Sequence, residues 1–329
     1  MFTRDSVIIS YNIKTPLTLI SRAVGNILQL THGQPIDPEE PVDPDKPLFS
    51  NGEQGFFYDP NDLSTMLQDS AGTVPVTGAG QPVGLILDKS KELALGSELI
   101  TNGDFSDGMT GWVVKNGTST ATIVNGAARL TATSSTSPQL SMPTAFLADK
   151  YVEVSVDFMN RTGGSRVYIG LSSTESTGVI NSVVSTKTSG SVKFRARVPS
   201  NFNGGLYCRL NSPTEGSYID FDNISVKEIV GNHAYQTTSA ARPILRDTPR
   251  RIDFDAVDDK LITNLPAQLT GCTVIRAVPN VGTQILTGQT IPATYNDNTD
   301  HCGLLVINRA LTPSETSAIT SEFNKRAGV

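Results

Sequence analysis

Stretches of alternating apolar and polar residues fill the middle of this chain and predict its main elements. In residues 151–158, Val152, Val154, Val156 and Phe158 point to one side of a strand and the residues between them point to the other. Residues 166–171, 191–198 and 205–210 show the same period of two. Turn signals rich in glycine and asparagine separate these stretches, and no helical pattern lies between them. Such spacing predicts a β-sandwich or a barrel.

The first 47 residues have a different pattern. Residues 6–13 alternate as in a strand, and residues 17–30 place apolar side chains at helical spacing after Thr15-Pro16, an N-cap followed by proline. So short an apolar helix is marginal alone in water. Its face therefore packs either on the protein's own sandwich or, by self-association or docking, in a larger assembly. In residues 34–47 a proline recurs every third residue among acidic residues, which predicts an extended polyproline II spacer.

Two capping signals predict helices in the rest of the chain. Asp59 and Pro60 have the residue types of an N-cap and a first helical position. Near the end, residues 303–309 predict a strand, and Thr312 with Glu315 forms the pattern of a capping box. We therefore expect the chain to end in a strand followed by a capped helix.

Composition narrows the possible function classes. Of the 329 residues, 38% are hydrophobic and 18% are charged, and glycine, serine, threonine and asparagine fill the difference, as in an all-β protein. A net charge of −6 and unclustered basic residues argue against a nucleic-acid partner, which requires a basic face. No apolar run is long enough for membrane insertion, and no signal peptide is visible, so we expect synthesis in a cytoplasm.

The three cysteines, Cys208, Cys272 and Cys302, are odd in number and widely spaced. A secreted disulfide scaffold has denser and paired cysteines. We therefore expect free, buried thiols, with a Cys272–Cys302 bridge as the alternative.

Several segments resemble a module that is common in tail and virion proteins of tailed bacteriophages: residues 51–60, 69–73 and 87–90. In that module the Leu-Asp-Lys-Ser run continues with a Gly-Asn-His segment and an Ala-Ala-Arg-Pro segment, which stand here at residues 231–234 and 240–243. Residues 252–261 resemble the strand-turn-strand of concanavalin-like (laminin-G-type) sandwiches, with Ala256 in place of the family's glycine. The resemblance implies that residues 48–90 and 231–329 form one split, concanavalin-like sandwich domain.

The intervening residues, 91–230, are then an inserted domain. Residues 102–112, with the sequence NGDFSDGMTGW, and residues 218–226, with the sequence YIDFDNISV, resemble the two ends of jelly-roll carbohydrate-binding modules. Together with an attachment or oligomerisation segment at 1–33 and a proline-rich linker at 34–47, this gives the expected organisation. The expected fold class is all-β, with two β-sandwich (jelly-roll-like) domains, an N-terminal attachment segment and a short C-terminal helix.

Five side chains of the insert are candidates for ligand binding. Tyr168, Tyr207, Arg166 and Arg209 lie on predicted strands with alternating faces, and tyrosine and arginine are favoured at binding surfaces. They line either a ligand-binding sheet or a solvated one. Trp112, the one tryptophan, can stack on a sugar ring. In the resembling modules, however, a tryptophan at this place is usually in the core, and we expect the same here.

The two ends of the insert also offer four oxygen-bearing side chains, Asp104, Asp107, Asp222 and Asn223. The resemblance implies a structural calcium site that joins the ends of the jelly roll, and calcium takes about six to eight oxygen ligands. The alternative is exposed turn residues. A second acidic cluster, Asp255, Asp258 and Asp259, is equally explained by turn chemistry.

Nothing in the sequence indicates an active site. The histidines have no metal-ligand spacing with one another or with the cysteines, and neither a nucleophile elbow nor a P-loop is present. We therefore expect that the protein is not an enzyme. Because a glycosidase needs only two suitably placed carboxylates, a polysaccharide depolymerase stays open as a less favoured alternative.

The resemblance implies a bacteriophage virion protein, such as a tail fibre or baseplate appendage, located in the virion tail and assembled in the host cytoplasm. Residues 1–33 would attach it to other tail or baseplate proteins, and the sandwiches would contact host-surface glycans. A homotrimer is expected because virion fibres are usually threefold, which is an argument by analogy. The alternative is an architectural capsid or tail decoration protein that binds no sugar.

Overall fold

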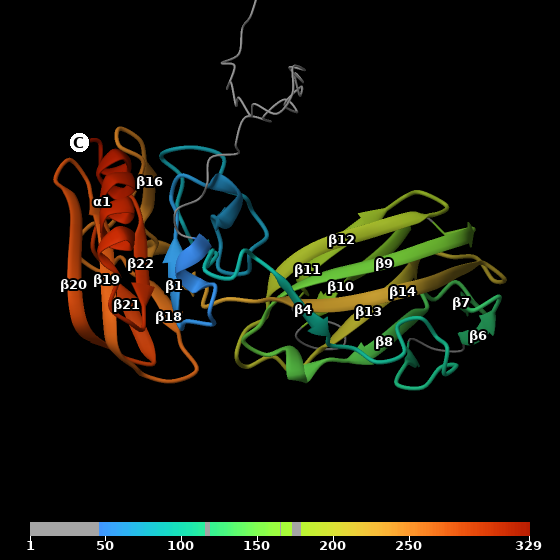
Figure 1. Cartoon of the computed structure of the whole chain (residues 1–329). Coiled ribbons are helices and arrows are strands. Elements are labelled where there is room, and N and C mark those ends of the chain that lie inside the picture. The colour runs from blue at the N-terminus through green and yellow to red at the C-terminus, as the bar shows by residue number, and fades with distance from the viewer. Residues whose placement is uncertain (1–45, 116–118, 165, 173–178) are drawn as a thin grey trace, which may run out of the picture. The chain divides into compact units, whose positions relative to one another are not determined.

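The computed structural model describes residues 46–115, 119–164, 166–172 and 179–329. Strands in several antiparallel sheets dominate this part of the chain, and its one α-helix is α1 (Pro313–Ala327) near the C-terminus (Figure 1). The predicted all-β fold with a short C-terminal helix is thus confirmed. The strand predicted at 6–13, the helix at 17–30 and most of the spacer at 34–47 lie outside the described residues.

Strands between residues 95 and 229 form two sheets, and Figure 1 labels most of these strands. The five-stranded sheet has the order β11 (Val179–Ser185), β10 (Arg166–Ser172), β13 (Gly205–Asn211), β8 (Gln139–Pro143) and β5 (Val113–Lys115). The six-stranded sheet has the order β12 (Gly190–Arg197), β9 (Tyr151–Thr162), β14 (Tyr218–Ile229), β7 (Ala127–Thr131) and β6 (Thr120–Val124), and β4 (Leu95–Glu98) also pairs with β14. A short 3-10 helix, η3 (Ala145–Leu147), follows β8.

The core of this sandwich follows the alternation seen in the sequence. Val152, Val154 and Val156 of β9 are fully buried and pack in one cluster with Ile169 of β10 and Leu206 of β13. Because alternate residues of a strand point to opposite faces, burying one set fixes which residues of the same strands point away from the core. That second set, on the five-stranded sheet, provides the candidate site described below.

Strands on either side of this region share the other sheets. One sheet has the order β1 (Gly55–Tyr58), β22 (Leu304–Ile307), β19 (Leu269–Val278) and β20 (Gly282–Ile291). A second has the order β2 (Met66–Leu67), β3 (Leu85–Ile86), β15 (Ala234–Tyr235), β18 (Leu261–Asn264) and β21 (Thr294–Asp297). A hairpin of β16 (Ile244–Arg246) and β17 (Arg251–Asp253) and the 3-10 helices η1 (Lys46–Phe49) and η4 (Ser239–Ala241) complete this part. Through β1 with β22 and β3 with β15, residues before 95 pair with residues after 229.

The carboxylate of Asp88 joins both of these flanks. Its Oδ1 accepts the N–H of Phe57 at 2.9 Å and that of Ser90 at 2.8 Å, and its Oδ2 accepts the N–H of Asn232 at 2.7 Å. Asp88 has no exposed surface. One buried side chain therefore satisfies backbone donors that lie far apart in the sequence.

Helix α1 covers the sheet that contains β22. Ile319 and Phe323, one helical turn apart, are buried against Phe57 of β1 and Leu305 of β22. The helix begins with the predicted capping box, in which Thr312 accepts the N–H of Glu315 and the Glu315 carboxylate accepts the N–H of Thr312. The predicted strand and capped helix at the end of the chain are thus confirmed.

The stability contributed by Glu315 is expected to disappear in acid. Its hydrogen bond to Arg309, at 2.8 Å, lowers the pKa of Glu315 from 4.5 to about 2. A carboxyl whose pKa is lower in the folded state stabilises the protein above its unfolded pKa, and this contribution is lost as the pH falls through the folded pKa. At pH 6 we expect the free energy of unfolding of the wild type to be higher than that of Glu315→Gln by about 1 kcal/mol. The difference is this small because the pair of Glu315 and Arg309 is partly solvated. Urea denaturation should show that this difference shrinks between pH 5 and 2, and a constant difference would contradict the assignment.

The helix predicted to begin at Asp59 does not form, and this prediction was wrong. A short 3-10 helix, η2 (Leu63–Thr65), forms instead, and Asp62 is its N-cap. It leads directly into β2, whose two residues are buried in the sheet. Asp59 is 4% exposed, and its carboxylate lies 3.1 Å from the Nζ of Lys89. Tertiary contacts thus override the local capping signal.

The three cysteines are free and buried, as expected, so the alternative Cys272–Cys302 bridge is not formed. Burial raises the pKa of the Cys302 thiol to about 11 and that of Cys208 further still, so neither is a reactive thiolate. Within the described ranges, no helix is both long and apolar enough to span a membrane.

Candidate functional site

The five-stranded sheet turns one face to its core and a largely polar face away from it. We call the second face the outer face. It comprises the residues of β5, β8, β10, β13 and β11 that alternate with the core residues, among them Lys115, Gln139, Ser141, Arg166, Tyr168, Gly170, Ser182, Tyr207 and Arg209. The strand at its centre is β13, with two strands on each side.

The strand register sets the outer face in two neighbouring rows. In the first row, Arg209 of β13 lies opposite Gln139 of β8 on one side and opposite Tyr168 of β10 on the other. In the second row, Tyr207 lies opposite Ser141 and Gly170. Directly opposed side chains in antiparallel strands have Cβ atoms about 5 Å apart. Two tyrosines, an arginine and an amide are thus contiguous on this surface.

Gly170 leaves room for the side chain of Tyr207 to lie along the sheet. A Cβ atom at Gly170 would lie 2.9 Å from the Tyr207 hydroxyl and 2.6 Å from the Cβ of Ser182. The Tyr207 hydroxyl is hydrogen-bonded to Ser182, two strands away on β11, and burial raises the pKa of Tyr207. Strands are about 4.8 Å apart, so the phenol ring must extend across β10 rather than stand upright. One face of the ring is therefore directed away from the sheet.

Arg209 is partly exposed, but its Nε is buried without a hydrogen-bond partner among the described residues. A buried donor with no acceptor is unusual and costs free energy. Beside it, Gln139 and Ser141 are each 7% exposed, and the Gln139 amide donates to the Ser141 hydroxyl at 2.7 Å. The first row thus combines a fixed amide with an arginine whose hydrogen-bonding capacity is incompletely used.

All four side chains proposed from the sequence for ligand binding lie on this face. Tyr168 and Arg166 are on β10, where the Arg166 Nη1 lies 3.5 Å from the Tyr168 hydroxyl, and Tyr207 and Arg209 are on β13. Their role in binding stays a prediction. Sequence reasoning missed Gly170, Gln139 and Ser182. A glycine inside an apolar strand was the available signal for Gly170, because such a glycine often marks the close approach of another group.

Trp112 belongs to the core, as expected, and not to the outer face. It is 6% exposed and packs with Phe105, whose ring centroid is 5.3 Å from that of the indole. The indole Nε1 donates to the carbonyl oxygen of Asn102 at 3.0 Å. With both its ring and its donor in use, Trp112 does not offer the sugar platform considered from the sequence.

The four side chains proposed for calcium are placed in two adjacent segments, since the N–H of Ile224 donates to the carbonyl of Gly103. Three of the four side chains, those of Asp104, Asp222 and Asn223, are engaged locally. The Asp104 carboxylate accepts from the Ser106 backbone and hydroxyl, which lowers its pKa, and Asn223 donates to Asp157. Asp222 accepts the N–H of Asn223, and the N–H of Asp107 donates to the Asn102 side chain. Calcium at Asp104, Asp107, Asp222 and Asn223 stays a prediction.

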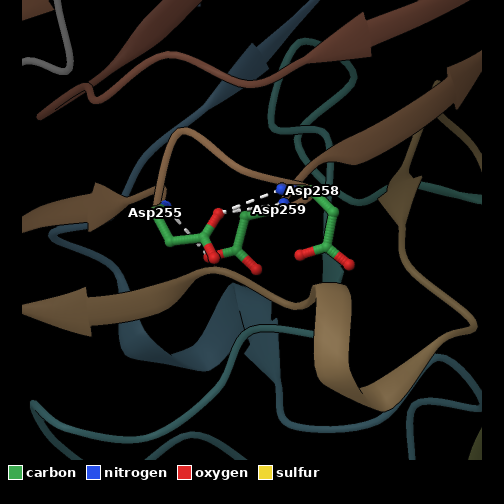
Figure 2. Close-up of side chains that lie close together, drawn as sticks. All are labelled: Asp255, Asp258 and Asp259. Carbon is green, nitrogen blue, oxygen red and sulfur yellow. Dashed lines mark hydrogen bonds between the residues drawn. The ribbon is translucent and has the colours of Figure 1, made fainter.

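In the described part of the chain, three ligating groups within 4.8 Å of one another occur at Asp255, Asp258 and Asp259 (Figure 2). The Asp255 Oδ1 accepts backbone N–H groups from Val257, Asp258 and Asp259, which lowers its pKa. Burial raises the pKa of Asp259, whose Oδ2 accepts the N–H of Asp255. These hydrogen bonds hold the loop between β17 and β18, so turn chemistry accounts for the cluster.

No protein-family model and no curated protein matches this chain. Among solved structures, a family 61 carbohydrate-binding module in complex with β-1,4-galactotriose is 14% identical, with a TM-score of 0.32 over 40% of this chain and 98% of that one. A family 11 carbohydrate-binding module of a Clostridium thermocellum cellulosomal cellulase is 16% identical, with a TM-score of 0.29 over 42% and 96%. The enzymatically active domain of bacteriophage CBA120 tailspike protein 4 is 13% identical, with a TM-score of 0.31 over 40% and 21%. Structures similar to part of this chain thus include carbohydrate-binding modules and a phage tailspike domain, but TM-scores this low carry no functional argument.

Proposed function

We propose that this protein binds a glycan on the outer face of its five-stranded sheet. The observation that carries the proposal is the Tyr207 ring, which lies along the sheet across Gly170 and is anchored at its hydroxyl by Ser182. A flat aromatic surface stacks on the apolar face of a sugar ring. Because the ring is already held in place, little side-chain freedom is lost when a ligand binds.

The polar residues beside Tyr207 suit the hydroxyl groups of a sugar. Gln139 and Ser141 lie on β8, next to the strand of Tyr207, and they are held by their mutual hydrogen bond. Tyr168 presents a second ring in the adjacent row. A binding site typically combines apolar surface with a few fixed polar groups that orient the ligand.

The same face supports binding without cleavage. Glycoside hydrolysis generally requires two carboxyl groups on either side of the scissile bond. The five strands of the outer face, all of whose residues are described, contain no aspartate or glutamate. We therefore propose that the protein binds glycans and is not an enzyme. The alternative is a polysaccharide depolymerase. A decrease in polysaccharide chain length during incubation with the protein would support that alternative.

Replacing Tyr207 with alanine is expected to weaken glycan binding about five- to thirtyfold, because an aromatic contact at a binding site contributes about 1–2 kcal/mol. Tyr207→Phe should keep most of the affinity, since it retains the stacking surface and loses only the bond to Ser182. The measurement is binding of the full chain to a panel of purified bacterial surface polysaccharides, with and without calcium.

Tyr218→Ala is the matched control, because Tyr218 lies on the six-stranded sheet and should leave affinity unchanged. If wild type binds nothing in the panel, the architectural role without sugar binding becomes the better hypothesis. Unchanged binding by Tyr207→Ala would contradict the proposal that the site lies on the outer face.

We further propose that the protein is displayed on a bacteriophage virion as a tail fibre or baseplate appendage. The support is the resemblance of its flanking segments and the order of an apolar segment at 1–33, a proline-rich spacer at 34–47 and β-sandwiches. Residues 1–33 would dock on other virion proteins, with three copies associating. A truncation that begins at Leu48 should still bind glycan but fail to enter particles. Incorporation of the truncated chain would contradict docking through the N-terminus.

A further inference from the structure

The strands of the outer face carry basic residues and no acidic ones, although the whole chain is acidic. The five strands of the sheet contain Lys115, Arg166 and Arg209 and no carboxylate, and every residue of these strands is described. The net charge of the chain is −6. A surface of one sign on a protein of the other sign favours a ligand of complementary charge.

The opposite sheet of the same sandwich shows how this chain treats arginine and lysine elsewhere. There Arg129 pairs with Asp220 at 2.7 Å, and Glu153 takes both Lys193 at 2.8 Å and Arg195 at 3.0 Å. Three cations of that sheet thus have carboxylate partners. The strands of the outer face contain no aspartate or glutamate, so Arg209 takes no counter-charge from them, and an anionic ligand can supply one.

Arg209 is the cation best placed to receive that anion. It stands on the central strand, next to Tyr168 and Gln139, and its buried Nε has no hydrogen-bond partner in the part of the chain that the structure describes. Charges that are shielded from water interact more strongly with an oppositely charged ligand. A guanidinium also presents parallel N–H groups that match the two oxygens of a carboxylate, which a hydroxyl group cannot match.

The distance from Arg209 to the aromatic surface suits a sugar. Tyr207 and Arg209 are two residues apart on β13, which corresponds to about 7 Å along the strand. A sugar ring stacked on Tyr207 therefore brings its own carboxyl substituent, or that of the next sugar, within reach of Arg209. Neutral sugars would leave the guanidinium without an anionic partner.

We infer that the glycan bound by the outer face is acidic, and that Arg209 binds the carboxylate of a uronic-acid-type or similar acidic sugar. This inference rests on the proposed glycan-binding function and specifies the class of its ligand. It assigns Tyr207 to the sugar ring and Arg209 to the acid group, so the two residues have separable effects on binding.

The test compares matched ligands on the unmodified full-length protein. Probes are polyuronate oligosaccharides, the same oligosaccharides after reduction of their carboxyl groups, and a sulfated polysaccharide of similar charge density. We expect the carboxyl-reduced form to bind between about tenfold and a hundredfold more weakly than the acid, as befits loss of a charge-assisted hydrogen-bonded pair. Added salt should weaken binding of the acid and not that of the reduced form.

A variant assigns the effect to Arg209. Arg209→Gln should lower affinity for the acid to the level of the reduced form, while affinity for the reduced form stays unchanged. Lys193→Gln makes the same change of charge on the opposite sheet and should change neither. Equal thermal unfolding midpoints for the variants would show that the fold is intact.

Three results would overturn the inference in different ways. Equal affinity for the acid and its carboxyl-reduced form would show that the carboxylate is not recognised, although glycan binding itself would still be supported. Equal binding of the sulfated chain would show that the face recognises negative charge and not a carboxylate. Absence of binding to acidic and neutral chains alike would refute the proposed function itself.

Discussion

Asp88→Ala is expected to lower the free energy of unfolding by about 3 kcal/mol, because it leaves two buried backbone donors and one partly buried donor without an acceptor, and each buried donor costs about 1–3 kcal/mol. These donors are the N–H groups of Phe57, Ser90 and Asn232. Water cannot replace the carboxylate at a site with no exposed surface. Urea denaturation followed by circular dichroism measures the loss.

Two variants show whether the loss comes from these hydrogen bonds. Asp88→Asn keeps one acceptor oxygen and should therefore be destabilised less than the alanine variant. Asp247→Ala removes a carboxylate that is paired with Arg250 at the surface, so it should change stability by no more than about 0.5 kcal/mol. Equal effects of Asp88→Ala and Asp247→Ala would show that Asp88 is not a structural link between the flanks.

Trp112→Ala is expected to cost about 3–5 kcal/mol of stability, as is typical when a large aromatic side chain is removed from a core. The indole is 6% exposed, packs against Phe105 and donates to the Asn102 carbonyl. Trp112→Phe preserves the aromatic packing and loses the donor, so its cost should be about 1–2 kcal/mol. Because Trp112 is the one tryptophan, unfolding must be followed by calorimetry or circular dichroism rather than by tryptophan fluorescence.

The alanine and phenylalanine variants together distinguish the two roles considered for Trp112, a sugar platform and a core residue. If the indole were a sugar platform, alanine at this position would abolish binding and leave the unfolding temperature unchanged. The core position predicts the reverse for Trp112→Phe, which should be less stable and bind glycan normally. A stable Trp112→Ala variant with no affinity for glycan would contradict the core assignment.

Local rules in the sequence were sufficient where a single segment decides its own structure. The period of two in residues 151–158 predicts which valines of β9 are buried, and Thr312 with Glu315 predicts the start of α1. The prediction failed at Asp59, where the local signal for a helix was equally clear. There the carboxylate forms a partly buried ion pair with Lys89, and the following residues join a sheet. A prediction made from one segment at a time cannot include Lys89 or the neighbouring strands, because they are distant in the sequence.

The candidate site shows the same division. Alternation along β10 and β13 was enough to place Arg166 with Tyr168, and Tyr207 with Arg209, on common faces. The register between the strands could not be predicted from the sequence, because it depends on pairing between segments about 40 residues apart. It is this register that puts Gly170 beneath Tyr207 and Arg209 between Tyr168 and Gln139. The chemistry of the face was therefore predictable in its residue types and not in its arrangement.

The antiparallel pairing of β4 with β14 affects how easily the sandwich between these strands can be replaced during evolution or by engineering. Leu95 lies opposite Ile229, and the N–H of Val230 donates to the carbonyl of Ala94 at 2.9 Å, so the chain enters and leaves this sandwich at adjacent points. A segment whose ends are neighbours can be exchanged for another with equally close ends without lengthening or straining the surrounding chain. Under the proposed function, specificity can therefore evolve, or be engineered, by replacing this whole sandwich while the framework around Asp88 is retained.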